Sequence, residues 1–426
     1  MGTPEGWHTR RVGDIAELRR GFTWKKDQER GGPGHGRIPV LRIPNVQERL
    51  ELDDLIFLEG VSPEDLTRYR ASAGFTLLVG SNGNPARVGN CVYVDRNMDF
   101  VFASFLIAAS PADRREIAPE YLFRILASRT VQDAVTESVQ GSTGLKNINL
   151  GTLREVEVRL PPLPEQRKIA AILSSVDETI EKTEAVIDQL QVVKKAMMEE
   201  LLTRGMPGRH TRFKHTEIGE IPEGWEVVAV GDVCERMFVG IAQAATHAYV
   251  STGGVPIVRT TNVKPGRIER HDMLRISDEF ALQMASKALR AGDVLSARTG
   301  YPGVSALVDA ELDGAQCFTL LVSRPGPRLL GGYLMHLMNS PLGKEIVRQG
   351  QAGGAQQNLN VTVFERALIA LPTTAEQAEI VSLLDLVATR EDREKDAAVA
   401  LARLKSHVAA ELLSGDLRVT PDEAPA

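Results

Sequence analysis

Apolar side chains between residues 160 and 205 recur in alternating steps of four and three, which is the 3.5-residue spacing of a coiled-coil seam. The apolar members are Ile169, Leu173, Val176, Ile180, Ile187, Leu190, Met197 and Leu201, and two polar residues, Thr183 and Lys194, interrupt them. Prolines at 161, 162 and 164 suit the approach and first turn of a helix but not its interior. The pattern predicts one long helix whose narrow seam needs a partner helix.

Residues 371–415 repeat this pattern. Glu165-Gln166 near the start of the first segment matches Glu376-Gln377 in the second. The second seam comprises Ile380, Leu384, Val387, Leu401 and Leu412, with Glu391 and Glu394 at the positions of Ile180 and Thr183. The sequence therefore predicts two long helices that pair with each other, with the ends holding the pair together and a looser middle.

The repeat also includes the segments that precede the helices. The sequence Pro-Glu-Gly-Trp occurs at 4–7 and 222–225, and Val-Gly-Asp at 12–14 and 230–232. We interpret Trp7 and Trp225 as core residues at the entrance of each domain. An internal duplication is thus predicted, with an α+β fold of two mixed α/β globular domains and two long helices. The expected boundaries are 1–159 and 206–370 for the domains, 160–205 and 371–415 for the helices, and 416–426 for a flexible tail.

The composition is that of a soluble globular protein, with 43% hydrophobic and 25% charged residues. The sequence has no apolar run long enough to span a membrane and no recognisable signal peptide, so we expect a cytoplasmic protein. Cys91, Cys234 and Cys317 lie far apart without metal-ligand spacing, which predicts ordinary thiols and no metal site. The net charge of −6 comes from the two long segments and the tail, so it neither favours nor excludes DNA binding by the domains.

Two short β-rich runs each end in arginine followed three residues later by asparagine. These are Arg42 and Asn45 in the first copy, and Arg259 and Asn262 in the second. Arginine and asparagine side chains can pair bidentately with guanine and adenine edges, which makes them candidates for DNA recognition. The equally weighted alternative is a strand that ends in an Asx-type turn.

The next repeated feature is a loop rich in glycine and proline, in which Gly83 and Pro85 align with Gly300 and Pro302. Its DNA-binding candidates are Arg87 in the first copy, and Arg298 and Tyr301 in the second; the alternative is a tight hairpin. A later segment rich in glycine and amides adds Lys146, Gln356 and Gln357, with turn and capping roles as the alternative. Loops that diverge within a repeated frame suggest one scaffold that reads two targets.

The sequence carries no recognised catalytic motif. It lacks a Walker A loop, HExxH, GxSxG and the Asn/Asp-Pro-Pro-aromatic loop expected of a DNA methyltransferase. We therefore predict no catalytic residue and no cofactor bound by this chain.

The PEGW and VGD openings, the Gly-rich loops and the helix entry LPPLPEQRKIAAI, with its second copy, resemble the specificity subunit of type I restriction–modification systems over nearly the whole chain. The resemblance implies two target-recognition domains, each reading one half of a bipartite, asymmetric DNA target, with the helices paired as an antiparallel coiled coil. It also implies that two modification (methyltransferase) subunits carrying S-adenosylmethionine dock on the chain, and that ATP-driven restriction subunits can join.

This reading assigns Arg42 and Arg87 to one half-site, Arg259 and Arg298 to the other, and a phosphate contact to Lys146. The alternative function is a repeat-built scaffold that binds proteins without DNA specificity. The matched PEGW and LPxxxEQ elements are hard to assign to such a scaffold.

Overall fold

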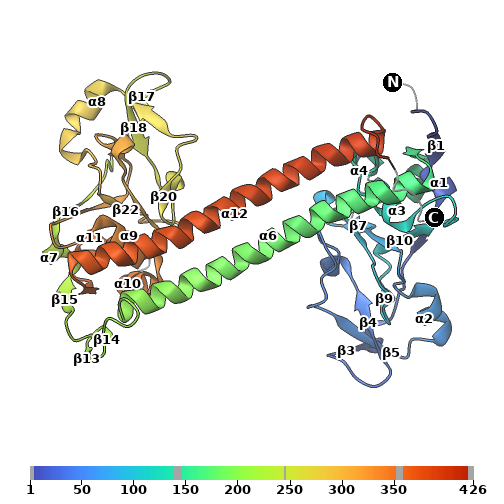
Figure 1. Ribbon diagram of the computed structural model, residues 1–426, viewed down its shortest axis with the longest axis horizontal. Coiled ribbons are helices and arrows are strands. Elements are labelled where there is room, and N and C mark those ends of the chain that lie inside the picture. The colour runs from blue at the N-terminus through green and yellow to red at the C-terminus, as the bar shows by residue number, and fades with distance from the viewer. Residues whose placement is uncertain (1–3, 139–145, 244–245, 352–357, 421–426) are drawn as a thin grey trace. The chain divides into compact units, whose positions relative to one another are not determined.

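The computed structural model describes residues 4–138, 146–243, 246–351 and 358–420. The chain forms two compact units: unit 1 comprises Met1–Lys182 and Ala398–Ala426, and unit 2 comprises Thr183–Ala397. Both divisions fall within the long helices α6 (Leu163–Thr203) and α12 (Thr374–Ser414) (Figure 1). Each unit therefore contains one globular portion and the halves of the two helices that pack on it.

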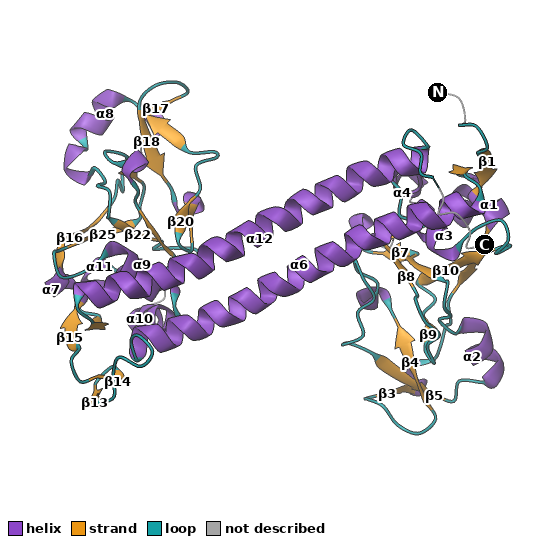
Figure 2. Cartoon of the chain, in the orientation of Figure 1, coloured by secondary structure: helices purple, strands orange, loops and turns teal. Residues whose placement is uncertain are grey.

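Unit 1 is built on two four-stranded sheets and two two-stranded ribbons, β1–β12 and β7–β11 (Figure 2). The first sheet has the order β2-β10-β6-β8 and is antiparallel throughout. The second has the order β3-β5-β4-β9, and its last pair is parallel. The strands are β1 (His8–Arg11), β2 (Ala16–Arg20), β3 (Glu29–Arg30), β4 (Arg37–Leu41), β5 (Ile56–Glu59), β6 (Thr76–Val79), β7 (Ser81–Asn82), β8 (Cys91–Tyr93), β9 (Val101–Phe102), β10 (Leu106–Pro111), β11 (Lys146–Asn147) and β12 (Glu157–Leu160).

Unit 2 repeats both sheets strand for strand, as β16-β25-β22-β23 and β17-β21-β18-β24. Two short hairpins, β13–β14 and β19–β20, occur in addition. The strands are β13 (Phe213–Thr216), β14 (Gly219–Pro222), β15 (Glu226–Ala229), β16 (Cys234–Val239), β17 (Tyr249–Val250), β18 (Val255–Val258), β19 (Val263–Lys264), β20 (Arg267–Ile268), β21 (Leu274–Ile276), β22 (Val294–Ser296), β23 (Ser305–Leu307), β24 (Gln316–Cys317), β25 (Leu321–Pro325) and β26 (Leu368–Leu371). The duplicated α+β fold predicted from the sequence is confirmed.

The shorter helices are repeated as well. They are α1 (Val12–Ile15), α2 (Pro63–Tyr69), α3 (Pro119–Leu126), α4 (Arg129–Ser138) and α5 (Leu150–Glu155) in unit 1, and α7 (Val230–Val233), α8 (Asp278–Gln283), α9 (Gly331–Asn339), α10 (Pro341–Gln351) and α11 (Val361–Glu365) in unit 2. Ser62 and Ser277 cap α2 and α8 in the same way, each accepting a hydrogen bond from the backbone three residues on. Tyr121 of α3 and Tyr333 of α9 are fully buried in their units, so these amphipathic helices complete the two cores.

The predicted seam is confirmed. Leu173 and Leu412 share the core of unit 1, and Leu201 and Leu384 share that of unit 2, so in both units the helix halves run antiparallel. The apolar seam positions between the ends, including Ile180, are half-buried. The ends of each helix are thus held by a globular core, and the central seam contributes less burial.

Two polar seam residues, Lys194 and Glu391, pair with each other. In unit 2, Nζ of Lys194 lies 3.0 Å from Glu391, which is only 5% exposed and also binds Lys395. In unit 1, Lys405 binds Asp177. The prediction of a loose seam is therefore wrong at Glu391, because a lysine from the opposite helix neutralises it.

A residue of the predicted flexible tail, Arg418, contacts other parts of unit 1. Arg418 binds the carboxylate of Glu165 through Nε and Nη2, at 2.8 and 3.0 Å, and the carbonyl of Glu5 through Nη1. The sequence did not reveal this contact of Arg418 with a distant carboxylate, and the flexibility expected of residues 416–426 stays a prediction. Residues 421–426 lie outside the described part of the chain.

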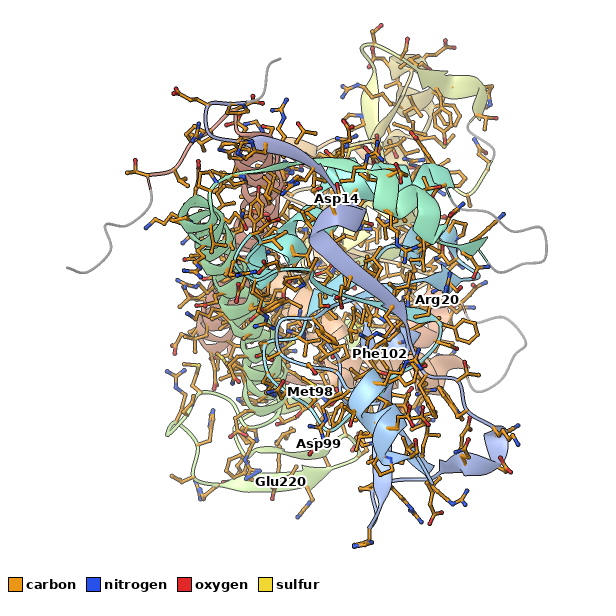
Figure 3. The ribbon with its side chains drawn as sticks, turned by 90° about the vertical axis from the view of Figure 1, so that its right-hand side faces the viewer. Asp14, Arg20, Met98, Asp99, Phe102 and Glu220 are labelled. Carbon is orange, nitrogen blue, oxygen red and sulfur yellow. The ribbon has the colours of Figure 1, made fainter. Side chains whose placement is uncertain are left out.

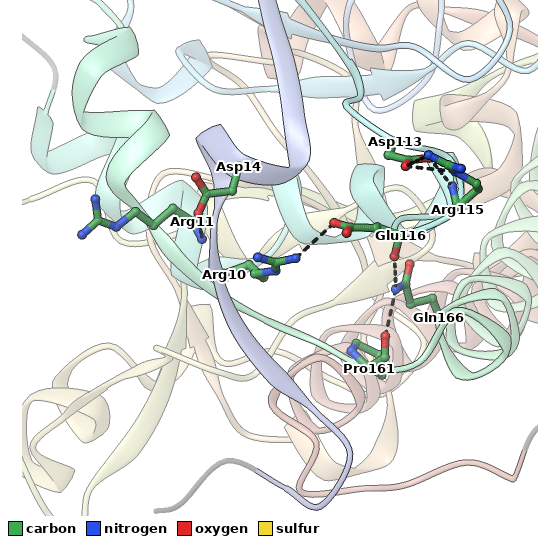
Figure 4. A network of polar contacts seen from close by, with 8 residues as sticks. All are labelled: Arg10, Arg11, Asp14, Asp113, Arg115, Glu116, Pro161 and Gln166. Carbon is green, nitrogen blue, oxygen red and sulfur yellow. Dashed lines mark hydrogen bonds and ion pairs between the residues drawn. The ribbon is translucent and has the colours of Figure 1, made fainter.

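Near its start, each of the two long helices, α6 and α12, carries a glutamine that binds three backbone groups. Gln166 accepts from the Ala118 amide and donates to the carbonyls of Glu116 and Pro161 (Figure 4). Gln377 makes the equivalent contacts with Leu330, Arg328 and Pro372. Because both glutamines are fully buried and satisfied, the repeated Glu-Gln pair fixes the helix on its domain.

The glutamate before each glutamine binds the tryptophan of the PEGW motif. Trp7 Nε1 donates to Glu165, and Trp225 Nε1 donates to Glu376, each at 3.1 Å. In unit 1 the second partner of the carboxylate is Arg418, and in unit 2 it is His210, whose Nε2 lies 2.8 Å from Glu376. We call these triads the helix-entry sites of the two units. Both tryptophans are buried, as predicted, and the clearest sequence motifs therefore serve the scaffold.

Candidate DNA interface

The Arg-Asn pairs form closed turns at the ends of β4 and β18. Asn45 is 1% exposed; its Oδ1 accepts from the Arg42 amide, and its Nδ2 donates to the carbonyls of Glu51 and Asp54. Asn262 is 3% exposed, accepts from the Arg259 amide and donates to the carbonyl of Glu269. Their amides are therefore used within the turn, as the Asx-turn alternative predicted.

The arginines of these pairs hold the following loops. Nη2 of Arg42 donates to the Asp54 carbonyl at 3.0 Å, and Nη2 of Arg259 donates to the Asp272 carbonyl at 2.7 Å. Arg42 also contacts the Asp54 carboxylate. These contacts make both arginines loop-positioning residues in the structure.

In unit 1 the segment that follows β6 pairs with residues 146–148. Strand β7 pairs with β11, Ile148 donates its amide to the Gly80 carbonyl, and Ser81 hydrogen-bonds to Asn147. Arg20 lies at the end of β2 (Figure 3). Its Nη2 donates to the Ile148 carbonyl at 3.2 Å. We call these residues, Arg20, Gly80, Ser81, Asn147 and Ile148, loop cluster 1.

Unit 2 builds the equivalent cluster with a different arginine. The Leu359 amide donates to the Arg298 carbonyl, and Nε of Arg298 donates back to the Leu359 carbonyl at 3.1 Å. Tyr301 follows in the loop and is 81% exposed. We call Arg298, Tyr301 and Leu359 loop cluster 2.

The backbone ladder defines which positions of the two clusters correspond. The carbonyls of Gly80 and Arg298 accept hydrogen bonds from the amides of Ile148 and Leu359, respectively. The amides of Gly89 and Gly303 close the two loops by donating to Val79 and Ala297, the residues directly before Gly80 and Arg298. The loop between them is longer in unit 1 than in unit 2. This corrects the alignment of Gly83 with Gly300, because glycine and proline recur in both loops without marking equivalent backbone positions.

The remaining candidates lie in or beside these clusters. Arg87 is exposed at the end of a 3₁₀ turn, Pro85–Arg87, that Asn84 caps. Lys146 is half-buried in β11. Gln356 and Gln357 lie outside the described residues. Arg87 and Lys146 therefore lie in or beside loop cluster 1, and Arg298 and Tyr301 lie in loop cluster 2. The Arg-Asn turns are separate from both clusters and position other loops.

Arg20 was not among the residues predicted from the sequence. The second copy has Val239 near this position of the ladder, so the repeat gave no reason to single out this arginine. Arg20 supplies in unit 1 the guanidinium that Arg298 supplies in unit 2, since both donate to the carbonyl of the returning segment. Only the pairing of strands distant in sequence reveals this correspondence.

The cysteines behave as ordinary thiols. All three are free, and burial raises the pKa of Cys91, Cys234 and Cys317 to about 12, so the thiol form dominates at neutral pH. Among the described residues, no group of three His, Cys, Asp or Glu side chains could hold a metal ion. None of the helices in the described ranges is both long and apolar enough to cross a membrane.

Comparisons with known proteins agree with this architecture. A family model described as "Type I restriction modification DNA specificity domain" matches residues 4–192 and 222–397. The type I restriction enzyme StySPI specificity subunit of Salmonella potsdam is 23% identical over 95% of this chain and 87% of its own length. A protein of Methanocaldococcus jannaschii, provisionally named the type I restriction enzyme MjaX specificity subunit, is 29% identical; the match covers 60% of this chain and 59% of that protein.

A solved structure shows the same fold. It is the crystal structure of the type I restriction–modification system S subunit from M. genitalium, which matches with a TM-score of 0.60. The identity is 12%, and the match covers 97% of both chains.

Proposed function

Because this chain belongs to the family of type I restriction–modification DNA specificity domains, we propose that it is the subunit that selects the DNA sequence for a multisubunit enzyme. It recognises a bipartite, asymmetric target, and each globular portion reads one half-site. The target-recognition domains are residues 1–159 and 206–370, and the helical segments 160–205 and 371–415 set the spacing between the half-sites.

The observation that carries this proposal is the contrast between frame and loops. Both four-stranded sheets occur in both units in the same strand order, whereas the clusters at the ends of β6 and β22 differ in loop length and in the source of the guanidinium. A repeated scaffold with divergent exposed loops suits a protein that presents two different recognition surfaces to two different DNA sequences.

The residues proposed to face DNA are those at the loop clusters. Arg20, Arg87 and Lys146 act on the first half-site, and Arg298 and Tyr301 on the second. Arg42, Asn45, Arg259 and Asn262 position the loops, as their hydrogen bonds to loop carbonyls indicate. Gln356 and Gln357 stay predictions.

The proposed partners supply the chemistry. Two methyltransferase subunits that carry S-adenosylmethionine dock on the chain, and two ATP-dependent restriction subunits can join them. This chain contributes no catalytic residue in that scheme. Its task places it in the cytoplasm, in contact with the DNA of the cell.

The test is competitive DNA binding by the complex of this chain with its modification subunit. Selection from random-sequence duplexes should enrich two short motifs at one fixed spacing, and methylome sequencing of cells that produce the complex should show the same bipartite target. Binding without any enriched sequence would favour the protein-interaction scaffold instead.

A further inference from the structure

Phe105 is a large apolar side chain that unit 1 leaves exposed. It lies in the turn between β9 and β10 and is 48% exposed, whereas its neighbours Phe102 and Leu106 are fully buried. Single exposed apolar residues are common, so exposure alone indicates no function. The position of Phe105 in the fold, compared with the equivalent turn of unit 2, supplies the further evidence.

The duplication shows that the fold does not need this residue. Phe102 and Cys317 are equivalent, since each carbonyl accepts the amide that starts the neighbouring segment, from Phe22 and Ile241 respectively. Leu106 and Leu320 are equivalent, because their carbonyls accept from Gly21 and Gly240. Residues 103–105 lie between these points in unit 1, but only residues 318–319 in unit 2. The turn of unit 1 therefore contains one extra residue.

The extra residue lies beside loop cluster 1. The Phe105 carbonyl accepts a hydrogen bond of 2.8 Å from Gly80, whose own carbonyl accepts from Ile148, the residue that Arg20 binds. A Cβ atom on Gly80 would lie 3.1 Å from the Phe105 oxygen and 2.9 Å from Ile107, so glycine permits this close approach. An exposed phenyl ring and the guanidinium of Arg20 are thus attached to one short hydrogen-bonded chain of backbone groups.

Loop cluster 2 also carries one exposed aromatic ring, but on another loop. Tyr301 stands in the loop after β22, while the shorter turn before β25 places Thr319 at φ +55° and buries Leu320. Each cluster therefore combines a guanidinium with one exposed ring, and the two are supplied from different strands in the two units. The change in position of the ring is expected if the ring contacts a ligand, since unit 2 folds without a residue at the position of Phe105.

We infer that Phe105 is a specificity-determining residue that contacts the C5 methyl group of a thymine in the half-site read by unit 1. This inference rests on the proposed function. In the major groove only thymine presents a methyl group, and an apolar side chain such as phenylalanine favours it over the bare C5–H of other pyrimidines. Arg20 is the adjacent hydrogen-bond donor.

The experiment uses the complex with its modification subunit and the bipartite target found by sequence selection. Each thymine of both half-sites is replaced in turn by deoxyuridine, which removes only the methyl group. The wild-type complex should lose about fourfold in affinity at one position, as expected for burial of one methyl group. The Phe105→Ala complex should bind thymine and uracil equally at that position and respond like wild type elsewhere.

Two further variants separate this contact from general effects. Phe105→Leu should retain part of the preference for thymine, and Leu282→Ala, at a site 77% exposed in unit 2, should leave every position unchanged. Melting temperatures of all variants should match, since unit 2 folds without a residue at this position.

The inference is overturned if the Phe105→Ala complex still discriminates thymine from uracil like wild type, or if the substitution lowers the affinity for the thymine and uracil targets by the same factor. It is also overturned if deoxyuridine at no position of the target lowers the affinity of the wild-type complex. A complex that selects no sequence at all would instead refute the proposed function. The two failures are therefore distinguishable.

Discussion

The two helix-entry sites bind equivalent glutamates with different basic side chains, arginine in unit 1 and histidine in unit 2. In unit 1, Glu165 at the start of α6 binds Trp7 and Arg418, which follows α12. In unit 2, Glu376 at the start of α12 binds Trp225 and His210, which follows α6. In both units the segment after one helix therefore supplies a basic side chain as the partner of the glutamate near the start of the other. The antiparallel arrangement of the helix halves is built into these contacts.

Folding shifts the pKa of one group in each site. The neighbouring carboxylate of Glu165 raises the pKa of Arg418, so this guanidinium stays charged across the accessible range. Burial alone would raise the pKa of Glu376, but hydrogen bonds from His210, the Met206 amide and Trp225 outweigh burial and lower it. The lowered pKa of Glu376 makes the stability of unit 2 depend on pH where this carboxylate titrates.

The largest expected effect comes from removing the tryptophan of either site. Trp225 is 2% exposed and Trp7 is 4% exposed, so replacing either by alanine should destabilise its own unit by about 3–5 kcal/mol. Hydrogen exchange resolved by peptide should show the loss in unit 1 for Trp7→Ala and in unit 2 for Trp225→Ala. Trp24→Ala, at a half-buried position, is the matched control and should have a smaller effect. Equal loss of protection in both units from one substitution would contradict the separation.

The buried seam pair of unit 2 gives the next largest effect. Glu391→Leu removes the carboxylate that pairs with Lys194 and should cost roughly 1–3 kcal/mol, because a charged group in the seam loses its partner. Adding Lys194→Leu should recover most of this loss, since two apolar residues suit a seam. Denaturant unfolding of the single and double variants measures the coupling. Strictly additive effects would show that the pair contributes no mutual stabilisation.

The periodic and repeated parts of the sequence predicted the long helices and the duplication. The sequence did not predict which residues are brought together by pairing between strands that are distant along the chain. The 3.5-residue pattern located α6 and α12, and the matching PEGW and Glu-Gln elements revealed the duplication. Arg20 and Phe105 went unnoticed because neither has a counterpart in the other copy. Their position beside Gly80 follows only from the pairing of β2, β6 and β10.

The Arg-Asn turns show a second limit of prediction from the sequence, because a residue type suited to base contacts can instead have a structural role. Asn45 and Asn262 are residue types that read adenine, and they repeat in both copies, yet each is consumed by its own loop. Repetition in both units is better explained by the shared frame, because two domains that read different sequences have no need for identical base contacts. Divergent positions are therefore the better candidates for recognition.

Acid should weaken unit 2 at its helix-entry site. The pKa of Glu376 is lowered by folding, so its contribution to stability is present above the ordinary value of 4.5 and is lost as the pH falls below that value through the folded pKa. His210→Ala should reduce this dependence by removing one of the groups that lower the pKa. Hydrogen exchange of unit 2 between about pH 3 and pH 6 measures the difference. An identical pH profile in the variant would exclude a role for His210.

The smallest effect is expected at the half-buried pair of Lys405 and Asp177 in unit 1. The side chain of Lys405 is 39% exposed where it meets Asp177, so Lys405→Ala should change stability by less than about 1 kcal/mol. The same denaturant measurement as for Glu391→Leu checks this. A loss as large as that of Glu391→Leu would show that burial does not separate the two pairs.

The most direct test of the central claim is methylome sequencing of cells that produce this chain with its modification subunit, comparing Arg87→Ala with Tyr301→Ala. Both side chains are exposed, so neither substitution should affect folding. Relaxed specificity in one half-site for Arg87→Ala, and in the other half-site for Tyr301→Ala, is the predicted result. A change in both half-sites from either substitution would contradict the assignment of one half-site to each unit.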